Sequence, residues 1–272
     1  ANVQMLSQQM GSRLRDAVRV ESITGKNAFF DQIGQATAQK RTTRHGDTPQ
    51  MDTPHARRRV SMVDYEYADL IDDQDKVRML IDPTSSYAMA AAAAMGRAID
   101  DEIIAAATGT AFTGETGSTS TALPSGQQIA AGGADLTLTK LREAKKILDI
   151  NDVDPSIQRY IACSPEQIDS LLGDTNVTSS DFNTIKALVQ GDVNQFMGFN
   201  FIVSNRLSKS GDNRTCFAWA EDGITLAVGK DVNARIDERA DKGYATQVYY
   251  CMSVGATRME EDKVVQILCD ES

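Results

Sequence analysis

The sequence has few of the residues from which catalytic and metal sites are built. It contains two histidines, His45 and His55, and four cysteines, none of them spaced as Cys-x-x-Cys. Neither a Gly-x-Ser-x-Gly nor a His-Glu-x-x-His motif occurs, so the elbow of a serine hydrolase and the helix of a zinc protease are both missing. We therefore expect no catalytic residue, no metal site and no cofactor, and we interpret the chain as a structural protein.

The sequence also has little that would direct it out of the cell or into a membrane. Four cysteines in 272 residues are too few for a disulfide framework, which favours synthesis in a reducing compartment. No apolar run approaches the roughly 20 residues of a membrane-spanning helix, and residues 1–4 lack the apolar core of a signal peptide. We expect a protein without a membrane partner, used in the cytosol or in an assembly made there.

Aromatic residues and net positive charge are scarce as well. Aromatics make up 6% of the chain, with one Trp, so the core must depend on aliphatic residues and Ala. The formal net charge of −10 disfavours sequence-specific contact with nucleic acid, because phosphate contacts need Lys and Arg. The charges are segregated: residues 26–60 are rich in Lys and Arg, whereas the charged residues from Glu260 onward are five acids and only Lys263. Such segregation predicts that one region of a subunit docks on another of opposite sign.

Patterns of apolar and turn-forming residues predict an α+β fold that begins with extended segments. Residues 1–25 are interpreted as a polar arm that can form a short helix. Residues 26–75 are interpreted as a long β-hairpin, with an outgoing strand near Phe29, a turn-rich stretch over 44–54 and a return strand over 57–70. This hairpin has too little apolar surface to offset its own ordering entropy, so we expect a neighbour to order it.

The clearest helix signal covers residues 83–108. It contains the run Ala90–Ala94, and Ala has the highest helix propensity; Gly109 marks the end. At 1.5 Å per residue the helix is roughly 35–40 Å long. Its small side chains predict close approach by a neighbouring segment.

The rest of the chain alternates helix and strand signals. Residues 113–133 are interpreted as a Gly/Ser/Thr-rich loop, either a connector or a decoration site. Helices are expected from Leu136, after Ser164 and over 182–189, and strands over 159–163, 198–204, 245–255 and 263–269. The stretch 223–231 has two glycines and a Lys but not the spacing of a phosphate-binding loop, so we interpret it as a strand followed by a turn.

The order of these parts resembles that of tailed-bacteriophage major capsid proteins with the HK97 fold. Three stretches carry the resemblance besides the layout: Ala98–Gly109 at the helix end, Met197–Asn205, and Val254–Ile267. The resemblance implies an N-terminal arm (1–25), an extended hairpin called the E-loop (26–75), a peripheral or P-domain (76–124 and 254–272) with a spine helix (83–108), and an axial or A-domain (125–253).

The same resemblance implies a function and partners. Such proteins self-assemble into hexamers and pentamers of an icosahedral shell around packaged double-stranded DNA, in a virion assembled in the host cytoplasm. A separate scaffolding protein, a portal protein and a decoration protein are the expected partners. Two other hypotheses are a tail or minor shell protein, and a small-molecule α/β enzyme, which would need a pocket with convergent titratable groups.

The charge segregation gives a hypothesis about contacts between subunits. We expect the arginines of the hairpin to dock on an acidic surface of an adjacent subunit. This interpretation is favoured over binding of nucleic acid, because the chain is acidic. An exposed ion pair contributes only about 0–1 kcal/mol, but a shell repeats it in every subunit. The arginines are Arg57, Arg58 and Arg59, and the candidate acceptors are Asp100, Asp101 and Glu102, or Glu260, Glu261 and Asp262.

Overall fold

The computed structural model describes residues 6–44, 46–48, 50–72, 84–173 and 195–271, whose strands form three sheets. The elongated sheet has the order β1 (Arg19–Ser22), β13 (Ile224–Arg239), β14 (Ala245–Arg258), β4 (Val63–Ile71). The compact sheet has the order β7 (Gln128–Ile129), β15 (Val264–Asp270), β12 (Asn213–Ala220), β8 (Arg159–Cys163), β10 (Phe199–Val203), β9 (Gln195–Phe196), with β11 (Lys209–Ser210) beside β12. The hairpin sheet has the order β2 (Asn27–Ile33), β3 (His55–Ser61), β5 (Ala111–Thr113), β6 (Thr119–Thr121).

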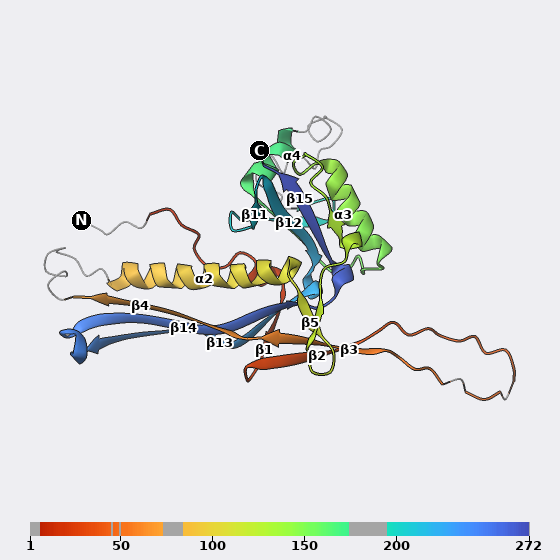
Figure 1. The fold of residues 1–272 in the computed structure, drawn as a ribbon, viewed down its shortest axis with the longest axis horizontal. Coiled ribbons are helices and arrows are strands. Elements are labelled where there is room, and N and C mark those ends of the chain that lie inside the picture. The colour runs from red at the N-terminus through yellow and green to blue at the C-terminus, as the bar shows by residue number, and fades with distance from the viewer. Residues whose placement is uncertain (1–5, 45, 49, 73–83, 174–194, 272) are drawn as a thin grey trace.

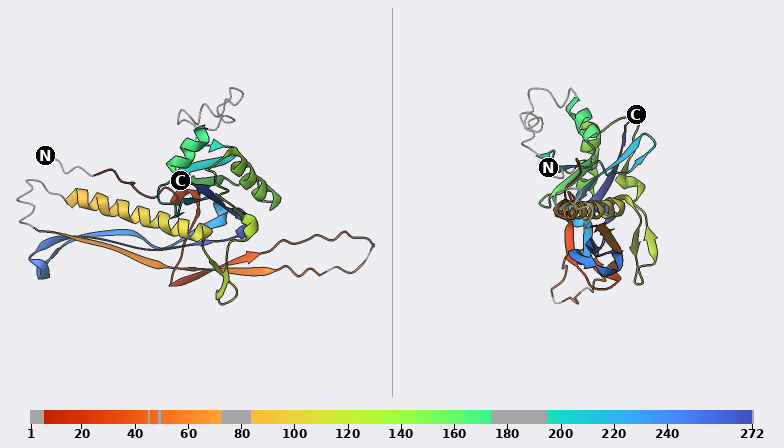
Figure 2. Two further views of the ribbon diagram at one scale, coloured as in Figure 1. Left: turned by 45° about the horizontal axis from the view of Figure 1, so that its top comes forward. Right: turned by 90° about the vertical axis from the view of Figure 1, so that its left-hand side faces the viewer.

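Helices α2 (Thr84–Thr108), α3 (Leu138–Ile150) and α4 (Pro165–Gly173) accompany the sheets, with short 3-10 turns at Arg15–Ala17, Ser125–Gln127, Glu221–Gly223, Ala240–Lys242 and Glu261–Lys263. No helix in the described ranges is both long and apolar enough to cross a membrane. Helix α2 lies between the elongated sheet and the compact sheet in all views (Figures 1 and 2). The mixed helix and sheet architecture expected from the sequence is confirmed.

The long helix forms as predicted and buries one face. Its buried residues Ala91, Met95, Ile99 and Ile103 recur every four residues, the spacing of one helical face. That face packs on β14 of the elongated sheet. The predicted helix is therefore confirmed over Thr84–Thr108, whereas Pro83 lies outside the described residues.

The compact sheet contains the main aromatic cluster. The predicted strands β8 and β10 are parallel neighbours, and β12 lies antiparallel to β8. Trp219 on β12 is fully buried, with Phe217 at 4.8 Å and Tyr160 at 5.7 Å between ring centroids. Its indole nitrogen donates to the carbonyl of Ala17 at 2.8 Å, which ties the arm to this unit. The predicted helices after Leu136 and Ser164 are confirmed as α3 and α4; the piece expected over 182–189 lies outside the described residues.

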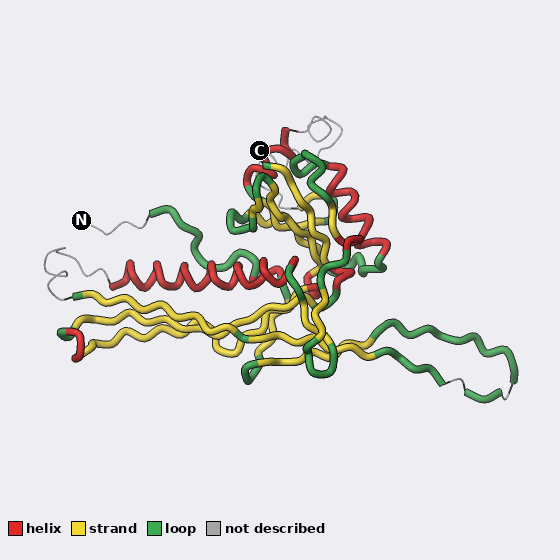
Figure 3. The backbone as a smooth tube through the Cα atoms, viewed as in Figure 1, coloured by secondary structure: helices red, strands yellow, loops and turns green. Residues whose placement is uncertain are grey.

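The hairpin differs from its prediction in one respect. Strand β3 pairs with β2, from Asn27 opposite Ser61 to Ile33 opposite His55. The expected single return strand over 57–70 is wrong, because the chain leaves the hairpin at Met62 and β4 pairs with β14 in the elongated sheet. Gly255 permits this crossing, since a Cβ there would overlap the carbonyl of Ser61. Beyond the hairpin, the described residues of 34–54 run outward as a loop (Figure 3).

Two further segments of the chain pair with strands that the sequence analysis did not expect. The stretch 113–133 was expected to be a loop, but it contributes β6 and β7, and β5 before it joins the hairpin sheet beside β3. Strand β13 and most of β14, expected in the A-domain, belong to the elongated sheet, whereas β15, expected in the P-domain, pairs with β12 in the compact sheet. The strands predicted over 245–255 and 263–269 are confirmed as β14 and β15, whereas β5, β6 and β7 were not predicted and β13 continues to Arg239, beyond the turn expected within 223–231. The sequence pattern of a strand carries no information about which distant strand is its partner.

Candidate assembly surfaces

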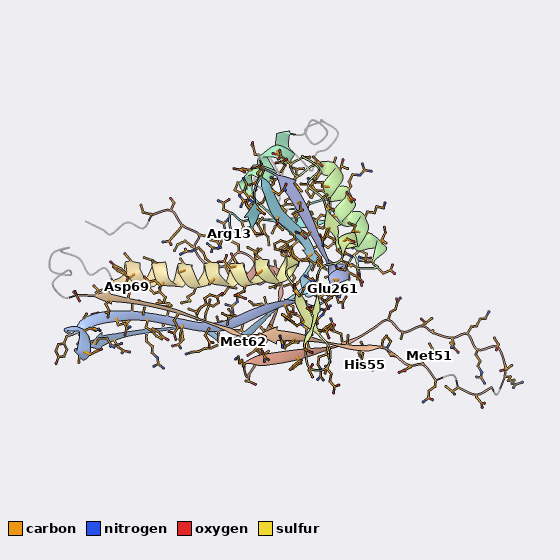
Figure 4. The ribbon with its side chains drawn as sticks, in the orientation of Figure 1. Arg13, Met51, His55, Met62, Asp69 and Glu261 are labelled. Atoms are coloured by element: carbon orange, nitrogen blue, oxygen red, sulfur yellow. The ribbon has the colours of Figure 1, made fainter. Side chains whose placement is uncertain are left out.

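The base of the hairpin is fixed to the C-terminal strands by Arg58. Its side chain is buried, and its Nε donates to the carbonyl of Met259 at 2.8 Å. Its guanidinium also pairs with Glu261, and Gln32 on the facing strand donates to the same Met259 carbonyl at 2.7 Å. Glu261 lies close to the end of α2, where these segments meet (Figure 4). Arg58 and Glu261 are thus already engaged inside one subunit.

A second arginine, Arg258, completes this junction and was not singled out from the sequence. It is fully buried; its Nη1 donates to the carbonyls of Ala107 at 3.1 Å and Gly109 at 2.7 Å, and its Nη2 donates to Thr121 at 3.2 Å. Desolvation by burial lowers the pKa of Arg258, although Glu261 opposes the shift. A cation at these carbonyls is favoured by the negative end of the helix dipole. The sequence feature that could have pointed to Arg258 is its position as the single charged residue within 254–259.

The two arginines beside Arg58 point to the other face of the hairpin. Arg57 is partly exposed and its Nε donates to Asp31 at 2.6 Å, which lowers the pKa of that carboxyl. The guanidinium of Arg57 lies 5.6 Å from the ring centre of Phe29, and that of Arg59 lies 4.7 Å from the ring centre of Phe112. Such cation–π contacts hold the side chains flat against the hairpin sheet.

The acidic group at the end of α2 begins with Asp100, which holds the N-terminal arm. Asp100 is fully buried and accepts hydrogen bonds from Gln9 Nε2 and Ser12 Oγ, both at 2.5 Å, and from the backbone N–H groups of Arg13 and Leu14, both at 3.1 Å. One turn earlier on the helix, a Cβ at position 96 would overlap the arm backbone, so only Gly fits there. The close neighbour expected for the small helix residues is, at this point, the arm of the same chain.

The other acids of the two candidate patches also have partners within the chain. Asp101 accepts from Arg206 Nε at 2.6 Å, and Glu102 accepts from the hydroxyl of Tyr65. Burial and the contact with Glu102 raise the pKa of Tyr65, which keeps the phenol protonated. In the second patch, Glu260 pairs with Lys263 at 3.2 Å and Asp262 accepts from Gln127 at 3.4 Å. Contact of any of these residues with an adjacent subunit stays a prediction.

The side chains that could act in catalysis or bind a metal ion are either far apart or already paired within the described residues. His45 lies outside the described residues, and within them no group of three or more His, Cys, Asp or Glu side chains could hold a metal ion. A cavity of about 740 Å³ opens beside the end of α3, but its Arg159 and Asp149 are paired with each other at 2.6 Å. The four cysteines are free, and burial raises the pKa of Cys163 to about 12, so this thiol stays protonated.

Comparison with known proteins identifies the family. The phage capsid protein family matches residues 1–271, whereas a search of curated proteins finds no match. A capsid protein of the cyanophage P-SCSP1u has 21% identity and a TM-score of 0.77, over 99% of this chain and 92% of that one. Capsid proteins of Ralstonia phage GP4 and Helicobacter pylori bacteriophage KHP30 both have 11% identity, over 100% of this chain and 94% of theirs, with TM-scores of 0.77 and 0.73.

The similarity to these capsid structures over the whole chain confirms the HK97-like fold expected from the sequence. The match to the family extends over nearly the whole chain, so it includes every element described above. The chain therefore belongs to the phage capsid protein family, and it is a major capsid protein that forms the shell of a phage particle.

Proposed function

We propose that copies of this chain assemble as hexamers and pentamers into an icosahedral shell that encloses packaged double-stranded DNA. The observation that carries the proposal is the loop formed by the described residues of 34–54, which extends away from the subunit beyond the hairpin (Figure 3). Ile33 at its base is 73% exposed and Met51 within it is 44% exposed. Apolar side chains on such an extension gain burial only from another molecule, and in a shell that molecule is a second copy.

The charge of the chain supports a shell that contains DNA without reading its sequence. The net charge of −10 opposes tight phosphate contact, so DNA would be enclosed and touched only locally. We further propose that assembly takes place in the host cytoplasm with a separate scaffolding protein, that a portal protein occupies one vertex, and that a decoration protein binds the outer surface.

We also propose that the protein has no catalytic activity of its own. The family is one of structural proteins, and the histidine and cysteine side chains of the described residues do not form a nucleophile–base pair. Assembled shells incubated with ester, phosphoester and peptide substrates should give only background hydrolysis. Turnover that is abolished by a single substitution in the chain would contradict this statement.

The three arginines of the hairpin keep a proposed role at the subunit boundary, but Arg58 has a different role from Arg57 and Arg59. Arg58 is committed to Glu261 of its own chain, so we propose that it sets the direction of the hairpin. Arg57, whose side chain is 40% exposed, is available to an acidic surface of the adjacent subunit, and Arg59 supports it from the same face. Asp100 is fully buried against the arm of its own chain and is therefore no longer a candidate acceptor. The acids that stay candidates are Asp101, Glu102, Glu260, Glu261 and Asp262.

The test is to shorten the loop and to observe assembly. Residues 36–52 are replaced by a short Gly-Ser connector, and the chain is expressed with the scaffolding protein of its phage. The hairpin strands and the other two sheets do not depend on the loop, so circular dichroism should stay unchanged. Electron microscopy should show capsomers or small oligomers in place of the closed shells of the unmodified chain. Normal shells from the shortened chain would refute the role of the loop.

A further inference from the structure

The elongated sheet has two open edges, and on the face away from α2 they differ in charge. In the sheet order, β4 ends one side, and on the other side β1 covers only Thr225–Val228 of β13. The following residues of β13, 229–239, are all exposed and have no strand beside their outer edge in the described part of the chain. Open strand edges of this kind pair with strands of other chains unless something prevents it, and charged side chains commonly do so.

The face of this sheet that lies away from α2 shows how the charges are arranged. Helix α2 packs on β14, and Val248, Met252 and Val254 belong to the same buried core as its side chains. Because side chains alternate along β14, the residues between these three belong to the opposite face. On that face Ser253 lies between Lys230 on β13 and Asp64 on β4.

Two further cross-strand rows each place one charge on the same face. Cys251 lies between Asn233 on β13 and Glu66 on β4, and Tyr249 lies between Arg235 and Ala68. In the next row Gln247 lies between Asp237 and Leu70. On this face the β13 edge therefore carries Lys230 and Arg235 against Asp237, with Arg239 paired to Asp241, whereas the charges of the β4 edge are the acids Asp64 and Glu66.

The hydrogen-bond partners of Asp64, Glu66 and Lys230 within the described residues are neutral. Asp64 accepts from the hydroxyl of Ser253, and Glu66 accepts from the hydroxyl of Tyr249 at 3.1 Å. The ammonium of Lys230 lies 3.1 Å from the sulfur of Cys251. No ion pair of these residues or of Arg235 occurs in the described part of the chain. All four positions are exposed, so each charge is available to a second molecule.

We propose that, in the assembled shell, the basic β13 edge of one subunit meets the acidic β4 edge of the next copy in the same capsomer. The proposal rests on the shell function given above. A contact of either edge with itself would place like charges together, whereas the head-to-tail contact places Lys230 and Arg235 beside Asp64 and Glu66. A contact between two different edges of identical subunits closes into rings when the rotation allows it.

Charge reversal of each edge tests the proposal. Lys230→Glu with Arg235→Glu makes both edges acidic, and Asp64→Lys with Glu66→Lys makes both edges basic. Each double variant should lower the yield of closed shells by at least about tenfold at low salt, where screening is weakest. The fourfold variant, with both edges reversed, should recover the yield of the unmodified chain. Reversal of Arg142 and Lys146, both exposed on α3, changes the net charge equally to the first variant and serves as its control.

A mixture of the two double variants gives a sharper result. Alternating copies place opposite charges at every contact in a ring with an even number of subunits, but leave one repulsive contact in a ring of five. Native mass spectrometry should therefore show that hexamers recover in the mixture and pentamers do not. Equal shell yields from both double variants and the unmodified chain would overturn the edge contact while leaving the shell function intact. Failure of the unmodified chain to form shells would instead contradict the shell function.

A covalent readout covers the case in which the reversed variants fold poorly. In a Cys251→Ser background, Glu66→Cys and Arg235→Cys introduce one thiol on each edge. Oxidation of assembled shells should give a ladder of disulfide-linked subunits on a non-reducing gel. A background with either new thiol alone should give no ladder beyond dimers. Monomers only, from shells that carry both thiols, would contradict the proposal.

Discussion

The carboxylate of Asp100 determines how firmly the N-terminal arm is attached to the spine helix. It is fully buried and accepts from side chains of Gln9 and Ser12 and from the backbone of Arg13 and Leu14. Asp100→Asn keeps the shape but removes the charge and turns one acceptor into a donor that faces other donors. Hydrogen bonds to a charged group contribute about 1.5–3 kcal/mol each. Loss of two of them should reduce the free energy of arm detachment by about 3–6 kcal/mol.

Limited trypsin digestion after Arg13 and Arg15 measures arm detachment directly. When cleavage reports the opening equilibrium, about 3 kcal/mol corresponds to roughly 100-fold faster cleavage. Asp101→Asn is the matched control, because the adjacent Asp101 only pairs with Arg206 and both side chains are partly exposed. Such a pair contributes about 0–1 kcal/mol, so its cleavage rate should change by about fivefold at most. Equal rates for the two variants would refute the conclusion that Asp100 holds the arm.

Three further predictions concern stability, each measured by urea unfolding. Gly96→Ala should destabilise the subunit by about 1–3 kcal/mol in spite of the better helix propensity of Ala, because its Cβ would overlap the arm backbone; a more stable variant would contradict this contact. Ala93→Leu, at a buried position, should cost about 1–3 kcal/mol, whereas Ala92→Leu, at an exposed one, should be nearly neutral, and equal effects would contradict the helix orientation. Burial raises the pKa of Glu271, but hydrogen bonds from Arg214 and its neighbours outweigh it and bring the value to about 2. The stabilisation by Glu271 is therefore present above about pH 4.5 and lost as the pH falls toward 2, and Glu271→Gln should flatten this limb of the stability curve.

Local patterns were sufficient to predict most elements of the fold. The run Ala90–Ala94 and the spacing of Leu141 and Leu148 specify helices through propensity and periodicity, which act within a few residues. The partner of a strand is not local information. Nothing near Met62 shows that β3 and β4 belong to different sheets, because the change depends on Gly255, almost two hundred residues later.

For the candidate contact residues, too, part of the arrangement follows from local sequence patterns and part does not. Three consecutive arginines were treated as one group, yet successive side chains of a strand point to opposite faces, so Arg58 is buried while Arg57 and Arg59 lie on the other face. Strand periodicity would have separated them from the sequence alone. Likewise, successive helix residues point about 100° apart, so the acids at 100–102 contact three different segments.

The Asp100 contact, in contrast, could not be predicted from the sequence. The arm residues that donate to it lie nearly ninety positions away, and their polar character gives no indication of a helix partner. The sequence shows only a Gly within an otherwise strong helix signal, which is typically either a packing feature or a weak point in the helix. The structure assigns it to packing against the arm.

Cryo-electron microscopy of particles formed by this chain with its scaffolding protein tests the shell assignment most directly. The account predicts closed icosahedral shells built of hexamers and pentamers, in which density for residues 34–54 lies against a neighbouring subunit. Open tubes, or dispersed small oligomers in which this loop contacts no other copy, would contradict it.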